Sequence, residues 1–403
     1  MVVWESEALG NVANMSCDKV SVSKLTVENY ISTENMLPDR GGIELAAKLP
    51  TAGNVNMFSP GDVLFSNIRT YFKKVWLADR HGGASADVIV FRTRDTQKVD
   101  SQYLYYALSS DSFIESTVTA SKGTKMPRGD KDAMLRYTMP LPPLPVQRRI
   151  AGILSAYDEL IENNQRRIRI LEDMARSLYR EWFVHFRYPG HESVPLEDSP
   201  LGRIPQEWEV KSAPNCVAIN PRVTVPRDGE KPFVPMGCLS NDSMLISDIE
   251  SRSGNSGAKF QNGDTLFARI TPCLENGKTG YVQFLPYSQD VAFGSTEFIV
   301  LRSRTLTPEF VYCLARSDEF RNAAIKSMSG ATGRQRVQEK CFDAFLIAQP
   351  PRELLDRFSG IVAPSFRLIY GLHHQIENLR RTRDLLLPRL LSGNVHLLPE
   401  GVA

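Results

Sequence analysis

The sequence contains little of what marks secreted, membrane or metal-binding proteins. Its six cysteines are widely scattered and form no CxxC pair, so we expect reduced, mostly structural thiols and neither zinc binding nor redox activity. No run approaches the roughly 18 apolar residues of a membrane span. The first residues, MVVWESEALGNV, contain no basic stretch followed by an apolar one. We therefore expect a soluble cytoplasmic protein without membrane association.

The common motifs of enzymes that act on DNA are also missing. A phosphate-binding loop ending in Gly277-Lys278-Thr279 would need glycine where Pro272 stands. The Pro-Pro pairs at 142–143 and 350–351 precede long apolar repeats, and no glycine-rich turn indicates a methyltransferase cofactor site. No carboxylate cluster recurs, and the six histidines show neither HxxxH nor HExxH spacing. We expect no catalytic residue, metal or cofactor in this chain.

Charge is nearly balanced along the whole chain. Lysine and arginine number 48 and aspartate and glutamate 46, which gives a net charge of +2. A protein that coats nucleic acid non-specifically is far more basic, so any positive charge that binds DNA must be local. The 403 residues exceed what one hydrophobic core usually organises, and two or more domains are expected.

What the sequence does contain is an internal repeat. The segment FSPGDVLFSNIRT, which begins at Phe58, recurs as FQNGDTLFARITP at Phe260, 202 residues later. QYLYYALSSDSF at 102 matches EFVYCLARSDEF at 309, and apolar positions coincide without a gap after Pro143 and Pro351. Loop insertions explain the small drift in displacement. Each half is therefore a domain followed by a long helix.

Short apolar runs bounded by Gly, Pro, Asn and Asp predict strands within each domain, with a helix at 101–110 and another at 308–317. Gly61-Asp62 and Gly263-Asp264 are interpreted as tight turns that feed a strand. The predicted fold is mixed α/β (α+β), with a pseudo-two-fold internal repeat. The expected organisation is a first domain at 1–145, a central long helix at 146–187, a linker and second domain at 188–350, a C-terminal long helix at 351–393 and a tail at 394–403.

The two long helices carry narrow apolar seams with seven-residue spacing, which is typical of a coiled coil. The first, about 146–183, would be about 55 Å long, and the chain course favours an antiparallel pair that separates the two domains. Asn164 on the seam could set the register. Pro364 and Gly371 predict a bend in the second helix, and Pro388 its end. The predicted seam consists of Ile150, Leu154, Tyr157, Ile161, Asn164, Ile168, Leu171, Leu178, Phe358, Val362, Ile369, Ile376, Leu379 and Leu386.

Two similar domains at a fixed separation suit the recognition of two short sequences on one duplex, since half-sites one turn apart lie about 34 Å from each other. The candidate contacts follow each Gly-Asp turn and recur in a glycine-containing polar loop of each half. Arg and Asn can bond base edges, whereas Lys mostly meets phosphate. Arg69 and Arg269 are the first candidates. The full set is Asn67, Arg69, Tyr71, Lys73, Lys74, Lys122, Thr124, Lys125 and Arg128 in the first half, and Arg269, Thr271, Asn276, Lys278, Thr279, Thr332, Arg334, Gln335 and Arg336 in the second.

These motifs resemble the specificity subunits of type I restriction–modification systems. The resemblance covers essentially the whole chain and is carried by YISTENMLP and FSNIRTYFKK in the first half, GDTLFARITPCLENGKT in the second, the linker SPLGRIPQEWEV, and the proline-led helices LPPLPVQRRIAGILSAYDELIENN and QPPRELLDRFSGI. Together and duplicated, these motifs are highly specific.

The resemblance implies a non-catalytic subunit that binds double-stranded DNA at a bipartite, asymmetric site, one part per target-recognition domain, with the helices setting the spacer. It implies docking to two modification subunits, which hold S-adenosylmethionine, and to two restriction subunits, which use ATP and Mg²⁺. Arg148, Arg149, Arg166, Arg167, Arg169, Arg380, Arg381 and Arg383 on the helices could face the modification subunits. The alternatives are a DNA methyltransferase or nuclease, a coiled-coil scaffold that does not bind DNA, and a specificity subunit of a methylation-only system.

Overall fold

The computed structural model describes residues 4–287, 290–331 and 333–395. Contacts divide the chain into two units: unit 1 comprises the described parts of residues 1–161 and 377–403, and unit 2 comprises those of residues 162–376. Two long helices, α5 (Leu144–Tyr179) and α9 (Arg352–Leu391), each contribute to both units. The predicted pair of domains joined by long helices is therefore present. Because the division cuts through both helices, the domain boundaries given above stay predictions.

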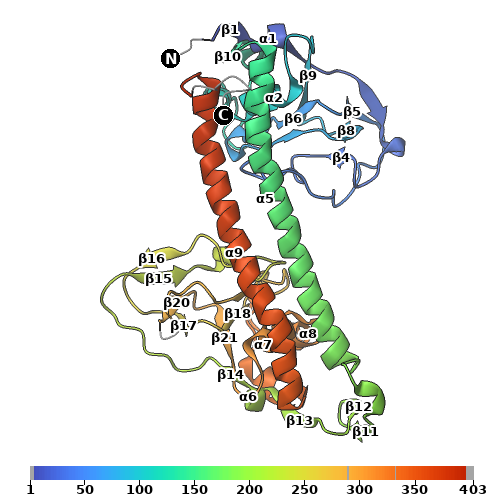
Figure 1. The fold of residues 1–403 in the computed structure, drawn as a ribbon, viewed down its shortest axis with the longest axis vertical. Coiled ribbons are helices and arrows are strands. Elements are labelled where there is room, and N and C mark those ends of the chain that lie inside the picture. The colour runs from blue at the N-terminus through green and yellow to red at the C-terminus, as the bar shows by residue number, and fades with distance from the viewer. Residues whose placement is uncertain (1–3, 288–289, 332, 396–403) are drawn as a thin grey trace, which may run out of the picture. The chain divides into compact units, whose positions relative to one another are not determined.

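Unit 1 is a mixed domain with two four-stranded sheets, ordered β2-β9-β6-β7 and β3-β5-β8-β4, and a short β1-β10 pair (Figure 1). Its strands are β1 (Ser6–Ala8), β2 (Ala13–Met15), β3 (Lys19–Ser21), β4 (Tyr30–Ile31), β5 (Asn54–Phe58), β6 (Val63–Ser66), β7 (Val75–Leu77), β8 (Gly82–Ala84), β9 (Val88–Thr93) and β10 (Thr138–Pro140). Its helices are α1 (Leu9–Val12), η1 (Val22–Lys24), η2 (Thr70–Phe72), α2 (Ser101–Ser109), α3 (Asp111–Thr119) and α4 (Lys131–Arg136).

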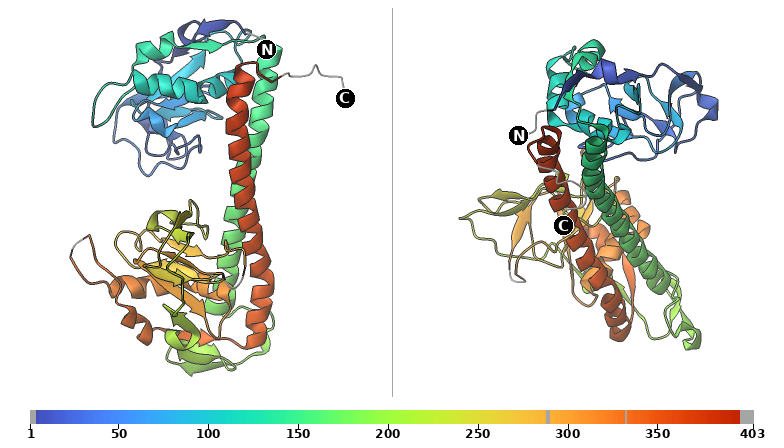
Figure 2. Two further views of the ribbon diagram at one scale, coloured as in Figure 1. Left: turned by 90° about the vertical axis from the view of Figure 1, so that its left-hand side faces the viewer. Right: turned by 45° about the horizontal axis from the view of Figure 1, so that its top comes forward.

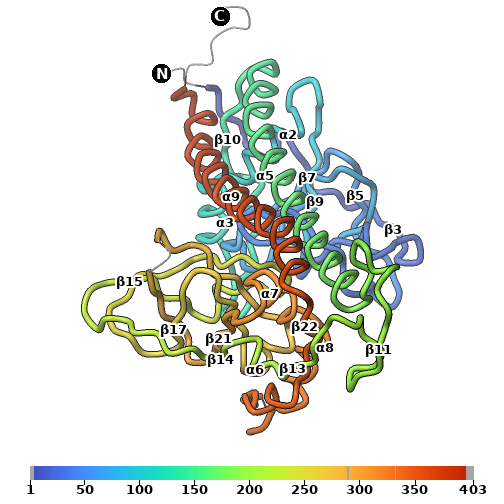
Figure 3. Tube along the Cα trace, turned by 60° about the horizontal axis from the view of Figure 1, so that its bottom comes forward, coloured from blue at the N-terminus to red at the C-terminus, as the bar shows by residue number. Residues whose placement is uncertain are grey.

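Unit 2 repeats this plan, with sheets ordered β14-β21-β18-β19 and β16-β15-β20-β17 and a β13-β22 pair; α7 packs against β21 and β18 (Figure 3). Its strands are β11 (Leu196–Ser199), β12 (Gly202–Pro205), β13 (Glu209–Ser212), β14 (Val217–Ile219), β15 (Lys231–Val234), β16 (Glu250–Arg252), β17 (Ala258–Phe260), β18 (Thr265–Ala268), β19 (Thr279–Tyr281), β20 (Ala292–Gly294), β21 (Phe298–Ser303) and β22 (Leu346–Gln349). Its helices are η3 (Arg180–Val184), η4 (His191–Ser193), α6 (Ala213–Cys216), η5 (Met236–Cys238), α7 (Pro308–Arg316), α8 (Asp318–Lys326) and η6 (Glu339–Ala344).

The two units share a framework but differ at one sheet edge. In unit 1, β5, β8 and β4 are neighbours in this order, and their counterparts in unit 2 are β17, β20 and β15. The fourth strand lies on opposite sides: β3 pairs with β5, whereas β16 pairs with β15. The repeat in the sequence therefore predicts the common framework, and the edge strand is specific to each unit.

The Gly-Asp turns have the predicted structural role, and each also holds an ion pair. Gly61 and Gly263 adopt φ of 87° and 86°, a conformation that glycine allows at low cost. The carboxylate of Asp62 accepts hydrogen bonds from Nε and Nη2 of Arg92, each at 2.8 Å. Asp264 accepts the same fork from Arg302, at 2.7 and 2.6 Å. The turn is thereby tied to the central strand of each sheet.

The ends of the long helices belong to the domain cores, and the helices run antiparallel within each unit (Figure 2). In unit 1, Ile150 and Leu154 of α5 share one apolar cluster with Leu387 of α9 and Phe113 of α3. In unit 2, the ring of Phe183, just after α5, lies 4.7 Å from Phe310 of α7 and 4.9 Å from Phe358 of α9. Removing either helix end would therefore open a domain core.

The predicted seam is buried or half-buried at every position. The fully buried members are Ile150, Leu154, Ile161, Asn164, Ile168, Phe358, Val362, Ile369 and Ile376, and the half-buried ones are Tyr157, Leu171, Leu178, Leu379 and Leu386. Within unit 2, Asn164 Nδ2 donates to Gln375 Oε1 at 3.4 Å. Burial at these positions fits the packing of a seam, and the pairing role of each residue stays a prediction.

Two sequence predictions, the helix end at Pro388 and the linker, are wrong in detail, and the bend expected at Pro364 and Gly371 stays a prediction. Helix α9 continues through Pro364 and past Pro388 to Leu391. Because Pro364 has no N–H, the Gly360 carbonyl lacks its helical partner. Both residues are exposed, so water can bond to the Gly360 oxygen. Beyond Pro388, Leu390 and Leu391 pack in the unit 1 core, which compensates for the proline. The segment interpreted as a linker contains the β11-β12 hairpin.

No helix in the described part of the chain is both long and apolar enough to cross a membrane. The six cysteines, all of which are described, are free thiols.

Candidate nucleic-acid interface

In each unit the structure brings the two predicted contact segments together. The segment after β6 joins the polar loop through an isolated bridge between Ile68 and Arg128, and Ile270 pairs with Arg336 in the same way. The Arg69 amide donates to the Pro127 carbonyl at 2.9 Å, and the Thr271 amide to the Gln335 carbonyl at 3.1 Å. The two stretches that the sequence offered separately therefore form one surface in each half.

We define surface 1 as Arg69, Tyr71, Thr124 and Lys125, and surface 2 as Thr271, Asn276, Arg334 and Gln335. All four side chains of surface 1 are exposed, as are Asn276 and Arg334, while Thr271 and Gln335 are half-buried. Arg69 Nη2 reaches the Lys125 carbonyl only at 3.5 Å, so most of its donors stay available. Thr332, also predicted in the second loop, lies outside the described residues. Each surface thus offers guanidinium, hydroxyl or amide groups to a ligand.

Two loop arginines that the sequence suggested for DNA contact have an acidic partner within their own unit. Arg128 Nη2 lies 2.9 Å from Asp87 Oδ1, and Arg336 Nη2 lies 2.6 Å from Glu297 Oε1. The two acids occupy matching positions of the repeat. Hydrogen bonding to Arg336 lowers the pKa of Glu297, and the same bond raises the pKa of Arg336. Both arginines fasten the polar loop to the framework, which leaves less of their charge for DNA.

Lys74 and Lys278 also have matching structural roles. Lys74 Nζ donates to the Thr33 carbonyl at 2.7 Å, and burial lowers the pKa of Lys74. Lys278 Nζ donates to the carbonyls of Leu239 and Met236 at 2.8 and 3.2 Å. Each ammonium group closes a loop of its own unit, so the structure favours a structural role over the predicted DNA contact.

Three other predicted contact residues form ion pairs within their own unit and differ in how exposed they are. Lys73 pairs with Asp111 at 2.8 Å and the highly exposed Lys122 with Asp130 at 2.6 Å. Arg269, one of the two first candidates, is only 25% exposed and pairs with Glu339 at 2.9 Å.

The alignment of the repeat explains why Arg269 does not match Arg69. Arg269 occupies the position of Asn67, since their amides donate to the matching carbonyls of Glu297 and Asp87. Arg69 corresponds instead to Thr271. Asn67 and Thr279 are 7% and 2% exposed, which contradicts direct DNA contact by either. Among the second-half candidates, the exposed cation without an acidic partner in the described chain is Arg334.

The helix arginines divide in a similar way. Arg383 is 5% exposed, and its Nη1 donates to Asp158 Oδ1, while the Tyr106 hydroxyl donates to Oδ2 of the same carboxylate. Arg383 is therefore a packing residue of unit 1 and not part of a docking face. Arg166, Arg167 and Arg169 on α5 and Arg380 and Arg381 on α9 are exposed as expected.

One feature of unit 2 was not predicted from the sequence. A groove of about 740 Å³ is lined by residues that include Arg227, Arg252, Asn255 and Thr296. Arg252 lies on the unit-specific strand β16, and its guanidinium carbon lies 4.0 Å from the centre of the Phe233 ring. Because β16 has no counterpart among the described strands of unit 1, the repeat pattern carries no signal for this groove.

The candidate interface holds no arrangement for metal chemistry in the described residues, since no group of three or more His, Cys, Asp or Glu could hold an ion there. What the two surfaces can do chemically is bond to a polyanion and to polar edges of bases.

Comparison with known proteins supports the resemblance. Residues 1–173 match the family model described as type I restriction modification DNA specificity domain. The specificity subunit of the type I restriction enzyme MjaIX from Methanocaldococcus jannaschii is 25% identical over 313 residues, which are 74% of this chain and 70% of that one. The specificity subunit of EcoEI from Escherichia coli is 30% identical over 203 residues, but these span only 49% of this chain and 34% of that relative.

A solved structure extends the likeness of fold to the whole chain. The type I restriction–modification S subunit from M. genitalium aligns with a TM-score of 0.59 over 98% of this chain and 97% of that one, at 14% identity. The resemblance that the motifs indicated is therefore supported by both comparisons: residues 1–173 match the type I restriction modification DNA specificity domain model, and the whole chain has the fold of a type I S subunit.

Proposed function

We propose that this chain is the DNA sequence-recognition subunit of a type I restriction–modification complex. Surface 1 contacts one part of a split, asymmetric site and surface 2 contacts the other. The observation that carries the proposal is the repeated junction, in which the same bridge and the same acid–arginine pair hold an exposed polar loop against the segment after the Gly-Asp turn. A rigid framework with exposed donors is what base recognition requires.

The division of roles within each surface follows from charge and geometry. Arg69 and Arg334 present planar guanidinium groups that can bond guanine O6 and N7 or a phosphate in two-point fashion. Lys125 supplies a point charge suited to phosphate. The fixed pairs Arg128–Asp87 and Arg336–Glu297 position the loop without meeting bases.

The chain itself performs no chemistry in this proposal. Two modification subunits, which hold S-adenosylmethionine, dock on the helices and methylate adenine, and two restriction subunits use ATP and Mg²⁺. The exposed arginines of α5 and α9 provide charge for that docking. The α5–α9 pair sets the spacer between the two parts of the site.

The proposal is tested by selection from a library of random duplexes. The full chain, produced together with a type I modification subunit, is used to capture DNA, and the bound duplexes are sequenced. We expect two short specified segments separated by a constant unspecified spacer. Enrichment of one contiguous motif, or of none, would reject the proposal and favour a scaffold that does not read DNA.

A further inference from the structure

In unit 1, three segments meet behind surface 1, and Arg40 joins them. Its loop is closed by the bridge between Met36 and Ile43. The Arg40 amide donates to the Lys73 carbonyl at 3.0 Å. Its side chain donates from Nε and Nη2 to the Ser109 carbonyl at 2.8 and 2.6 Å, and from Nη2 to Asp111 at 2.7 Å. One residue therefore connects the segment after β6 to the junction of α2 and α3.

The backbone that Arg40 holds is strained. Asp39, Arg40, Arg69 and Lys73 have φ of 53°, 60°, 48° and 52°, which are left-handed values that non-glycine residues adopt at a cost of about 1–2 kcal/mol each. The Asp39 and Arg40 amides donate to the Phe72 and Lys73 carbonyls, so hydrogen bonds join the two segments that contain these residues. Such strain persists only where surrounding contacts determine the conformation. The Arg40 side chain, 6% exposed, anchors its own loop to Ser109 and Asp111.

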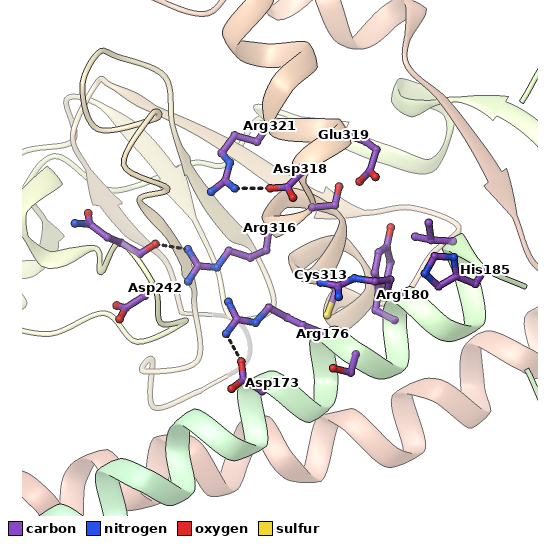
Figure 4. A pocket seen from close by; sticks show the side chains of 15 residues that line it. Asp173, Arg176, Arg180, His185, Asp242, Cys313, Arg316, Asp318, Glu319 and Arg321 are labelled. Atoms are coloured by element: carbon purple, nitrogen blue, oxygen red, sulfur yellow. Dashed lines mark hydrogen bonds and ion pairs between the residues drawn. The ribbon is translucent and has the colours of Figure 1, made fainter. Parts of the chain in front are cut away.

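Unit 2 has the same junction, but its arginine comes from the opposite side. Arg316, at the end of α7, is the counterpart of Ser109 in the repeat. Its Nη1 donates to the Asn241 carbonyl at 2.8 Å and to the Gly277 carbonyl at 2.7 Å. Asn241 lies in the loop closed by the Leu239–Ile246 bridge, which matches the loop of Arg40. Figure 4 shows Arg316 projecting from α7 across a pocket of about 730 Å³ that Arg176 of α5 also lines.

The Arg40 amide and the Arg316 side chain bond equivalent carbonyls of the repeat, those of Lys73 and Gly277. Lys73 and Gly277 directly precede the matched lysines Lys74 and Lys278, and both have positive φ, 52° and 84°. A Cβ placed on Gly277 would lie 2.8 Å from the Asn241 carbonyl oxygen and 3.8 Å from Arg316 Nη1, so the close approach of the two backbones requires glycine. The same segments therefore meet in both units, but the arginine lies in the bridged loop in unit 1 and at the end of α7 in unit 2.

The arginine comes from opposite sides of the junction in the two units, and this difference distinguishes a positioning role from simple space filling. Filling space behind the surface would need no cation, and the two units fill it with different side chains. What recurs is a guanidinium group that bonds a main-chain carbonyl of another segment, Ser109 for Arg40 and both Asn241 and Gly277 for Arg316, a task suited to its planar set of N–H donors. The segments so joined include the strand exit that carries Arg69 in unit 1 and Thr271 in unit 2.

We infer that Arg40 and Arg316 are positioning residues, each of which sets the recognition of one part of the DNA site and not of the other. The inference rests on the proposed function, because it requires that surfaces 1 and 2 read separate parts of the site.

The test is a crossed pair of variants in the full chain with its modification subunit. Arg40→Gln and Arg316→Gln are each assayed on the selected duplex and on two competitors, one changed in the first part of the site and one in the second. We expect Arg40→Gln to reduce discrimination in one part about tenfold and leave the other unchanged, and Arg316→Gln to do the reverse. Arg80→Gln, an exposed arginine paired with the neighbouring Asp79, is the control without effect.

One further measurement and two milder variants distinguish a positioning role from a general loss of folding. Thermal unfolding is recorded for each variant, and discrimination that stays intact while stability falls would show that the arginine only supports the fold. Where a Gln variant does not fold, Asp111→Asn in unit 1, whose side chain is 60% exposed, and Arg316→Lys in unit 2 weaken the same junctions more gently. An equal loss in both parts of the site would overturn the inference. An unmutated chain that selects no split site would instead reject the proposed function.

Discussion

Whether a basic residue is available to DNA depends on its partners, and the sequence does not give these. Lys74 and Lys278 stand in basic, polar segments, and their composition predicted DNA contact for both. In the structure each ammonium group bonds a carbonyl about 40 residues away, at 2.7 Å for Lys74 and 2.8 Å for Lys278. Such distant pairing arises from loop conformation, which local pattern does not encode. Arg69 and Lys125, in contrast, are exposed as a DNA contact requires, and the structure joins their two segments into one surface.

Replacement of Arg69 tests surface 1 directly. We expect Arg69→Ala to weaken binding of the selected duplex by about 1–3 kcal/mol and to relax one base position, because a two-point base contact is lost. Competition binding with duplexes changed one position at a time measures both effects. Arg80→Ala is a matched control, since Arg80 is also exposed and lies beyond β7, at the end of the β6–β7 pair away from Arg69. Equal weakening on all sequences would assign Arg69 to phosphate instead.

Burial of Glu172 makes a pH-dependent contribution to stability. The side chain is 5% exposed, and its Oε1 accepts hydrogen bonds from Ser243 Oγ at 2.7 Å and the Met244 amide at 2.8 Å. Burial raises the pKa of Glu172, while these bonds and the charges of Arg316 and Arg176 oppose the rise. Because the folded pKa lies above the unfolded one, the stabilising contribution is full below the unfolded value, near 4.5, and is lost as pH rises through the folded pKa.

The variant Glu172→Gln keeps an acceptor for both bonds but does not titrate. We expect it to unfold at a higher temperature than the unmutated chain at pH 8, with the difference shrinking as the pH falls toward 4.5. Calorimetry across this range checks the prediction. A Gln variant that is less stable at pH 8 would show that attraction to the nearby arginines outweighs the cost of burying the carboxylate.

At the scale of elements, the repeat predicts what both halves share and nothing of where they differ. The match of FSPGDVLF with FQNGDTLF identified the turn and strand that became β6 and β18, and the seven-residue spacing identified α5 and α9. The edge strands β3 and β16 lie outside those matches, so the groove beside Phe233 was missed. Pro388 was taken for a helix end because local propensity ignores the core packing of Leu390 and Leu391.

The polar residue on the helix seam offers a test of the helix pairing. Asn164 is 6% exposed and makes one long bond, to Gln375. We expect Asn164→Leu to raise the stability of the protein by about 1 kcal/mol, because apolar burial exceeds the value of a weak hydrogen bond. Thermal unfolding measures the change, with Leu160→Ala on the exposed side of α5 as a near-neutral control. Destabilisation by Asn164→Leu would show that the Asn164–Gln375 pair fixes the helix register at a net gain.

At the scale of the whole molecule, duplication gives two frameworks of one plan, and their differences lie on the surfaces. Each framework holds its exposed loop with a matched acid–arginine pair, while the residues that face solvent differ: Arg69 and Lys125 in unit 1, Asn276 and Arg334 in unit 2. Two unlike surfaces on related supports are suited to an asymmetric site, because each can be altered without disturbing the other's core. We therefore expect each unit to read its own part of the DNA site.

Sequencing of methylated adenines in a host shows whether the two units read separate parts of the site. The host expresses the chain with its modification subunit, either unmutated or with Arg334→Ala and Gln335→Ala in surface 2. We predict methylated adenines in a split motif, and in the variant a relaxation confined to one part of that motif with the other part and the spacer unchanged. A contiguous motif, no methylation at all with the unmutated chain, or a variant that relaxes both parts alike would contradict the account.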